Sequence, residues 1–183
     1  MDFLTLAKEV SHEIIKTYCR SQEITVSDNI KSGLKYNEYM SVIRLNGARL
    51  RIGFRVYYMI KHAAGLSHQK YGLDVEQISA LQVIDAMKEF CNATAGRLKY
   101  LLEQNDIITG HSLPFALKGY NELLFKEFSD SIADASWRLE NPQKAHIDCS
   151  IFYFSKDEKT IEKMSRLQGR FKKELADQAV EMF

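Results

Sequence analysis

Four polar or small residues recur at spacings that would place them on one side of an α-helix. Asp85, Glu89, Asn92 and Gly96 follow one another at intervals of four, three and four residues. Because each helical residue advances by about 100° around the axis, the four lie within an arc of about 60°. The opposite side, an arc of about 120° with the width of a core-facing stripe, is mostly apolar; it carries Val83, Ile84, Met87, Phe90, Cys91, Thr94, Leu98, Leu101 and Leu102.

The four residues on the other side are expected to face outward, and two of them have no evident structural reason to be there. An outward Asn lowers helix propensity without capping a helix end. A mid-helix Gly costs up to about 1 kcal/mol relative to Ala. The stripe would instead present a carboxylate and an amide one turn apart, beside a smooth surface that a partner can approach closely. The alternative, an ordinary polar solvent face, stays open.

The segment Asp85 to Gly96 resembles the signature helix of the CheC/CheX/FliY family of chemotaxis phosphatases. That signature has an acidic or Ser residue, a Glu four residues later, an Asn after three more and a Gly after four more. Lys99 and Leu102 follow as in the family, GHSLP at 110–114 resembles its Ser-Leu-Pro element, and residues 41–54 resemble its first hairpin. The resemblance covers roughly residues 40–155. The sequence departs from the family in a slightly shorter interval between Asn92 and Pro114, and in the residue types at Phe90, Cys91 and Arg97.

The resemblance implies an enzyme that hydrolyses the aspartyl phosphate of a CheY-type response regulator. Asn92 would orient the attacking water, since an amide both accepts and donates hydrogen bonds without carrying charge. Glu89 would dock on the regulator by pairing with its active-site Lys, and Asp85 and Gly96 would belong to the contact surface. The chain would need no cofactor of its own, because the Mg²⁺ would sit on the regulator. The rival hypothesis is a non-catalytic adaptor of the same fold that uses the same helix for binding.

The first helical segment offers a comparison within the chain. If the two halves of the sequence are duplicates, Glu9 and His12 stand where Glu89 and Asn92 do, and Lys16 takes the Gly position. The motif is broken there, so one active helix per chain is expected. That pattern is closest to CheX-like members and implies, by resemblance, a homodimer.

The expected elements are as follows. Periodicity predicts helices at 2–20, 56–66 and from Asp74, as N-cap, to about Asn105. A short strand is expected at 23–27, and strands 40–46 and 48–55 should form a hairpin about Asn46-Gly47, a dipeptide that favours positive φ. Two or three strands follow within 106–154, and an extended final helix covers about 157–182.

This order, helix–strands–helix repeated, predicts a single α+β domain over residues 1–183. It would have two layers, a mostly antiparallel sheet with long helices packed on one face. Short echoes such as Arg44-Leu45-Asn46 against Arg138-Leu139-Glu140-Asn141 suggest pseudo-duplicated halves, although chance similarity remains an alternative.

Composition argues against nucleic-acid binding, membrane binding, secretion and metal binding. The 183 residues carry a net charge of +1, which argues against broad binding to nucleic acid or to an anionic membrane surface. No signal sequence or membrane span is expected, and three unpaired cysteines favour the reducing cytoplasm. The five histidines lack metal-ligand spacing, so no metal site is expected, and His146 and Cys149 fit surface and core alternation in a strand. Cys91 is expected in the core. The row Arg49, Arg51 and Arg55 is typical of a solvated strand face. A contact with an acidic partner is the less favoured alternative.

Overall fold

The computed structural model describes residues 3–20, 23–28, 37–118, 133–167 and 171. Helices and strands alternate in the predicted order, with the long α3 in the middle of the chain. The elements are α1 (Phe3–Cys19), β1 (Thr25–Ser27), β2 (Tyr39–Asn46), β3 (Leu50–Tyr58), α2 (Ile60–Tyr71), α3 (Ala80–Glu103), β4 (Gly110–His111), β5 (Phe115–Lys118), β6 (Ala133–Glu140), β7 (His146–Ser155) and α4 (Glu158–Ser165).

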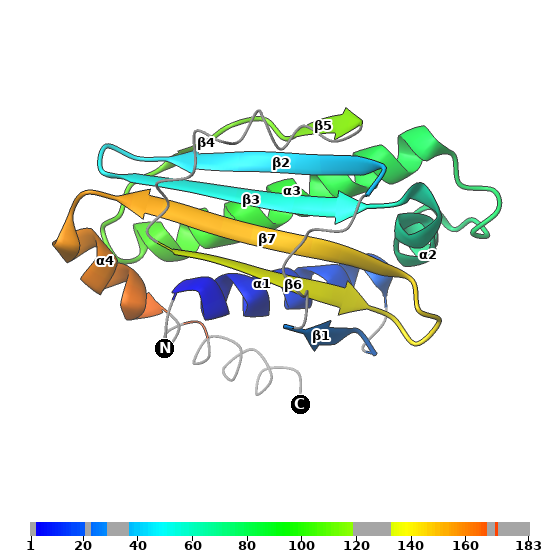
Figure 1. Ribbon diagram of the computed structural model, residues 1–183, viewed down its shortest axis with the longest axis horizontal. Helices are drawn as coiled ribbons and strands as arrows, with labels where there is room; N and C mark the ends of the chain where they lie inside the picture. Colours follow the sequence, from blue (N-terminus) through cyan, green and yellow to red (C-terminus); the bar gives the residue numbers. More distant parts are fainter. Residues whose placement is uncertain (1–2, 21–22, 29–36, 119–132, 168–170, 172–183) are drawn as a thin grey trace.

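All described strand pairs are antiparallel and belong to one sheet. The strand order is β1-β6-β7-β3-β2-β4, and β5 also pairs with β2. Figure 1 shows α1 and α3 together behind the sheet, with α2 and α4 at its two ends. The predicted two-layer α+β fold, with long helices on one face of an antiparallel sheet, is confirmed.

The sheet is symmetric about its central strands, β3 and β7. Exchanging β1 with β4, β2 with β6 and β3 with β7 reverses the strand order and so leaves the sheet unchanged. The buried positions of α1 and α3 match in the same way, at a constant offset of 80 residues; they are Phe3, Leu6, Ala7, Val10, Ser11 and Ile15 against Val83, Ala86, Met87, Phe90, Cys91 and Ala95. The architecture therefore has the predicted pseudo-duplicated halves.

Aromatic side chains join the two helices to the sheet. The ring of Phe54 on β3 meets Phe90 of α3 edge-on, with centroids 6.0 Å apart, and lies 6.2 Å from Trp137 on β6. The indole N–H of Trp137 donates to the Ser11 hydroxyl of α1 at 3.0 Å. Burying such a large side chain stabilises the fold by roughly 2–3 kcal/mol, and the hydrogen bond satisfies two polar groups inside the core. These contacts set how α1 and α3 are rotated over the sheet.

The β2–β3 hairpin forms where predicted, but the reason given for its glycine is wrong. Gly47 does not have a positive φ, and the Gly47 N–H donates to the carbonyl of Leu50 at 2.7 Å across a three-residue loop. A Cβ on Gly47 would lie 2.7 Å from the carbonyl oxygen of Ile108. The glycine is therefore required because another backbone segment approaches closely there.

The predicted bounds of two helices are also corrected. Residues 56–58 belong to β3 because its pairing with β2 continues to Tyr58, whose hydroxyl lies 3.0 Å from that of Ser41. Helix α2 starts only at Ile60 and ends at Tyr71, and the following Gly72, with a φ of +65°, is its C-cap. Gly65, the predicted end, lies inside α2.

Helix α3 starts later than predicted. Its N-cap is Ser79, not Asp74: the Ser79 hydroxyl accepts from the Gln82 N–H at 3.3 Å, while the Gln82 side chain accepts from the Ser79 N–H at 2.9 Å. This reciprocal capping box satisfies two backbone donors at the start of the helix. In the final segment, α4 covers Glu158–Ser165, and most of the predicted extension to 182 lies outside the described residues.

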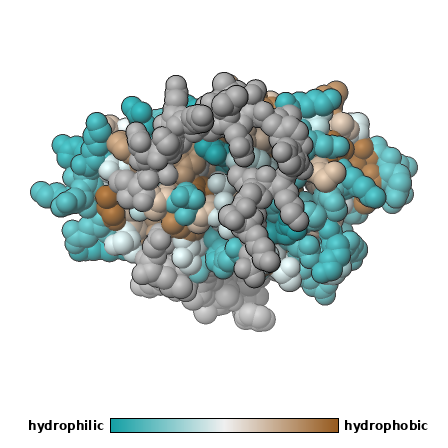
Figure 2. Space-filling model, in the orientation of Figure 1, coloured by the Kyte–Doolittle hydropathy of each residue, from teal (hydrophilic) through white to brown (hydrophobic). Residues whose placement is uncertain are grey.

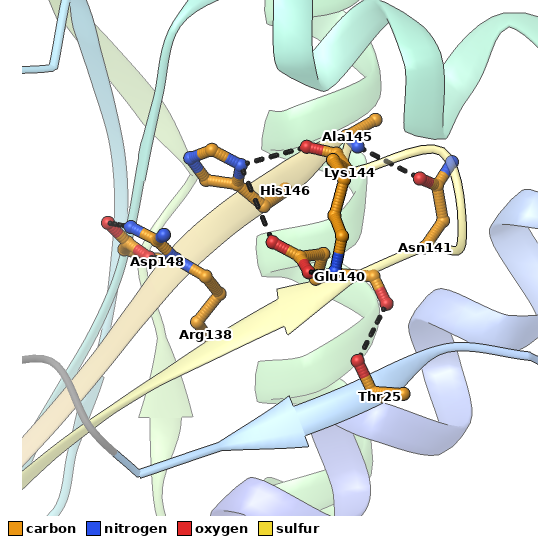
Figure 3. Close-up of polar contacts among 8 residues, drawn as sticks. All are labelled: Thr25, Arg138, Glu140, Asn141, Lys144, Ala145, His146 and Asp148. Carbon is orange, nitrogen blue, oxygen red and sulfur yellow. Dashed lines mark hydrogen bonds and ion pairs between the residues drawn. The ribbon is translucent and has the colours of Figure 1, made fainter.

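The β6–β7 turn fixes the end of the sheet next to α2 (Figure 3). The Asn141 side chain accepts from the Ala145 N–H at 2.9 Å and donates to the carbonyl of Gly65 in α2 at 3.3 Å. Close by, the Arg138 guanidinium makes two hydrogen bonds of 2.7 and 3.0 Å to the buried carboxylate of Asp148. The Asn141–Gly65 hydrogen bond thus ties α2 to the turn, and the Arg138–Asp148 pair links β6 to β7.

We expect Gly53→Ala to lower the free energy of unfolding by about 1–3 kcal/mol, because overpacking forces neighbours to move. Gly53 lies opposite Phe152 in the central β3–β7 pair, and an added Cβ would overlap the buried Phe152 ring. Denaturant unfolding followed by circular dichroism measures the change. Gly53→Ala combined with Phe152→Leu should recover part of the loss; no recovery would show that the ring is not the obstacle.

Candidate functional site

Helix α3 presents the predicted stripe to solvent. Asp85, Glu89 and Asn92 are exposed and Gly96 is partly exposed. On the opposite side, every residue of the predicted core arc is buried except Ile84, which is partly buried. The predicted orientation of the helix is thus observed in the structure.

The stripe continues in both directions as an apolar surface. Leu81, four residues before Asp85, is 74% exposed, and Tyr100, four residues after Gly96, is 45% exposed. Counting 19 residues at 1.5 Å each, the two are separated by about 28 Å along the helix. The face therefore has a polar centre and an exposed apolar residue at each end.

The Glu89 carboxylate is held by residues from two other helices. The Tyr18 hydroxyl of α1 donates to Glu89 Oε2 at 3.1 Å, and Lys70 of α2 forms an ion pair with the same oxygen. The Glu89 side chain is still 56% exposed. The carboxylate is thus anchored at one oxygen and open to solvent.

Lys70 reaches Glu89 through an aromatic environment. Its ammonium lies 5.0 Å from the ring centroid of Tyr18 and 5.3 Å from that of Tyr71, within the range of cation–π attraction. Burial lowers the pKa of Lys70, while the nearby Asp85 carboxylate opposes that shift. Burial, with smaller effects of Tyr71 and Cys91, raises the pKa of Tyr18 to about 12, so its hydroxyl remains a hydrogen-bond donor at neutral pH.

The other three stripe residues differ from Glu89 in their surroundings. The Asp85 carboxylate forms an ion pair of 2.6 Å with Lys88, one turn along the same helix. Asn92 makes no side-chain hydrogen bond within the part of the chain that the structure describes, which leaves its amide available to solvent. A Cβ on Gly96 would meet nothing within 4 Å. Gly96 is therefore not required by the packing of the described residues.

The corresponding face of α1 is used by the chain itself. The His12 ring nitrogen Nε2 lies 2.7 Å from the carbonyl oxygen of Ile24, next to β1. Lys16, which stands in the Gly96 position, is paired with Glu13 at 3.0 Å. His12 is thus engaged by its own chain where Asn92 is open, and of the two helices only α3 presents the full Glu, Asn and Gly pattern.

The cysteines, possible metal ligands and possible membrane-spanning helices were also considered in the described residues. Cys19, Cys91 and Cys149 are free and buried, and burial raises the pKa of all three thiols, that of Cys19 to about 12. Within the described residues, no three His, Cys, Asp or Glu side chains are grouped to hold a metal ion. The described helices include none that is long and apolar enough to cross a membrane.

The arginine row of β3 is only partly solvated. Arg49 and Arg51 are exposed and line an open hollow of about 520 Å³ beside Asp157, at the end of the sheet near α4. Arg55 instead stacks on the Phe152 ring, with its guanidinium carbon 4.4 Å from the centroid. Figure 2 shows that hydrophilic residues dominate the coloured surface on this side, with apolar residues scattered among them.

The sequence did not indicate that Lys70 and Tyr18 belong to the site. Tyr18 fits the apolar side of its helix and is 71 residues away from Glu89. Lys70 lies in a helix whose bounds were predicted too early to include it. No local pattern links either residue to Glu89, because the contact depends on how three helices pack.

Solved structures of similar fold include several chemotaxis proteins. No protein-family profile and no curated protein sequence matches this chain. A CheC-like superfamily protein from Shewanella sp. PV-4 has a TM-score of 0.65 at 15% identity, over 85% of this chain and 99% of the other. CheX from Borrelia burgdorferi, solved in a complex with CheY, BeF₃ and Mg²⁺, also has a TM-score of 0.65, at 16% identity over 83% and 97% of the chains. Thermotoga maritima FliY has a TM-score of 0.52 at 13% identity, over 92% and 96%. The resemblance to the CheC/CheX/FliY family is thereby confirmed at the level of the fold.

We expect Gly96→Ala to stabilise the isolated protein by about 0.5–1 kcal/mol, because Ala has the higher helix propensity and the added methyl meets open space. Differential scanning calorimetry should show the melting temperature rising by about 1–4 °C. A fall in melting temperature would mean that another part of the chain lies against this position.

Proposed function

We propose that this chain, which has the fold of the CheC/CheX/FliY structures, dephosphorylates a phosphorylated CheY-type response regulator. The observation that carries the proposal is the exposed Glu89 and Asn92 pair, one turn apart on a helix whose outward face is otherwise open. The solved CheX–CheY complex shows that a protein of this fold can bind such a regulator, and supports the choice of partner.

The reaction is hydrolysis of an acyl phosphate. A water oxygen attacks phosphorus in line with the bond to the aspartate oxygen; that bond breaks, inorganic phosphate leaves and the regulator recovers its carboxylate. The regulator supplies the aspartyl phosphate and its Mg²⁺, so the phosphatase needs only to place and orient the water. The Asn92 amide suits this role because its oxygen can accept a hydrogen bond from the water and its NH₂ can donate one to the phosphoryl group, while it adds no negative charge there.

The remaining stripe residues would bind the partner. Glu89 offers a carboxylate to a cationic group of the regulator, and Asp85 lies one turn away at the edge of the contact. Leu81 and Tyr100, exposed at the two ends of the face, would supply apolar contacts, as in other interfaces where apolar and aromatic groups contribute much of the affinity. Gly96 would let the regulator approach the helix backbone.

A non-catalytic adaptor that uses the same helix remains the alternative. An adaptor would need an exposed surface, yet it would not need an amide placed for water. The open amide of Asn92 therefore favours the phosphatase. By resemblance to CheX-like proteins we also propose that the chain acts as a homodimer, which sedimentation equilibrium can test.

We expect Asn92→Ala to lower turnover by about 100-fold or more, the scale on which removing one oriented polar group acts in other enzymes. Binding should change by less than about threefold, because the amide acts on the water and contributes little to docking. Phosphate release from an acetyl-phosphate-charged response regulator of the same organism gives turnover. Titration of the beryllofluoride-activated regulator gives the dissociation constant.

Asn46→Ala is a matched control, because it removes an exposed asparagine at the β2–β3 hairpin, outside the stripe of α3. It should leave turnover and binding unchanged. If the native protein binds the activated regulator but does not accelerate phosphate release, the adaptor hypothesis is correct and the phosphatase proposal is wrong.

Gly96→Ala tests whether the regulator approaches the helix backbone closely at this position, separately from the effect of the substitution on stability. The variant expected to be more stable should bind the activated regulator more weakly, by about tenfold, because a methyl group would intrude into a close backbone contact. Unchanged affinity would place the docking surface elsewhere on the protein.

A further inference from the structure

Lys70 and Tyr18 contact Glu89 at the same atom. Both the Tyr18 hydroxyl and the Lys70 ammonium bind Oε2, and no described residue donates to Oε1. The three side chains come from α1, α2 and α3, so the carboxylate is fixed where three helices meet. One of its two oxygens is held inward while the other stays available.

The geometry points to Lys70 and Tyr18 as positioning residues, which hold Glu89 Oε2 so that Oε1 is presented to a cationic donor of the phosphorylated partner. This inference rests on the proposed function of the α3 face. It assigns to α1 and α2 a part in recognition that the α3 motif does not contain.

The benefit of such an anchor is lower entropy loss on binding. A solvent-exposed Glu samples several rotamers, and a partner must select one of them at a cost in affinity. With Oε2 already bound at two points, the side chain enters the complex in the required rotamer. The partner then adds one charge-assisted hydrogen bond without first ordering the group.

Lys70 is placed to remain with Glu89 during docking. Its side chain is only 26% exposed and its ammonium lies near the rings of Tyr18 and Tyr71. Leaving Glu89 would strand a partly desolvated ammonium without its carboxylate, which is unfavourable. Lys70 therefore supports the outward presentation of Glu89 rather than competing with the partner for it.

The test compares Tyr18→Phe and Lys70→Met with Lys61→Met. Tyr18→Phe removes one hydroxyl and keeps the ring; Lys70→Met keeps an apolar chain between the rings and removes the charge. Lys61→Met makes the same charge change on an exposed residue of the same helix, and so controls for long-range electrostatics. The partner is the beryllofluoride-activated CheY-type regulator used above.

We expect Tyr18→Phe and Lys70→Met each to weaken binding by about three- to tenfold, since the first removes a hydrogen bond to the partly exposed Glu89 carboxylate and the second removes its ion pair. Turnover at saturating regulator should stay within about twofold, because Asn92 is untouched, and Lys61→Met should match the native protein. In a Glu89→Gln background, the two substitutions should have little further effect on binding. Tighter binding by Lys70→Met would mean that Lys70 competes with the partner, and an undiminished loss in the Glu89→Gln background would mean that the residues act independently of Glu89; either result overturns the inference.

A second measurement needs no partner. Urea unfolding midpoints of the native protein, Lys70→Met, Glu89→Gln and the double variant form a cycle in the isolated chain. Non-additive midpoints are expected, because the pair exists before docking. Additive midpoints would overturn the anchor itself, whereas non-additive midpoints in a protein that binds no activated regulator would reject the proposed function and leave the anchor established.

Discussion

The contact between the apolar side of α3 and the central strands of the sheet decides what the molecule can present to a partner. Phe90 packs against Phe54 with no room to turn, and residues before and after it on the same side are buried. A helix fixed at several points along 24 residues cannot rotate about its axis. The direction in which Glu89 and Asn92 point is therefore a consequence of core packing, and the amide needs no contact of its own to face solvent.

The same symmetric framework holds two helices that differ in what they expose. Six of their buried positions match at an offset of 80 residues, so both helices meet a similar packing demand. Their outward positions have diverged: His12 contacts the backbone beside β1, while Asn92 lies open. The sheet needs both helices to cover its apolar face, yet only α3 carries the full motif. Packing determines the residues on one side of each helix, and the two helices differ on the other side.

Periodicity alone predicted the orientation of α3, because one side of a helix buried on a sheet leaves a three- to four-residue repeat that is visible in the chain. The helix–strands–helix order and the main hairpin could be predicted for the same reason. The predicted bounds were less accurate at two places. Helix α3 begins at the Ser79 and Gln82 capping box instead of at Asp74. Pairing of β3 with β2 continues to Tyr58, so the strand extends into residues predicted to be helical. The sequence could not reveal that Tyr18 and Lys70 meet Glu89, since that depends on the relative placement of three helices. It also suggested the wrong reason for Gly47, whose neighbour Ile108 is 61 positions away.

The exchange of outer strands between the halves means that neither half is expected to fold alone. β1 from the first half adds to β6 of the second, and β4 and β5 from the second half add to β2 of the first. If either half were produced alone, some of its strands would lose the strands they pair with. A fragment ending before α3 would therefore expose an unpaired strand edge prone to aggregation. The exchanged outer strands therefore make each half necessary to the folding of the other, and α1 serves as a scaffold that covers the sheet beside α3.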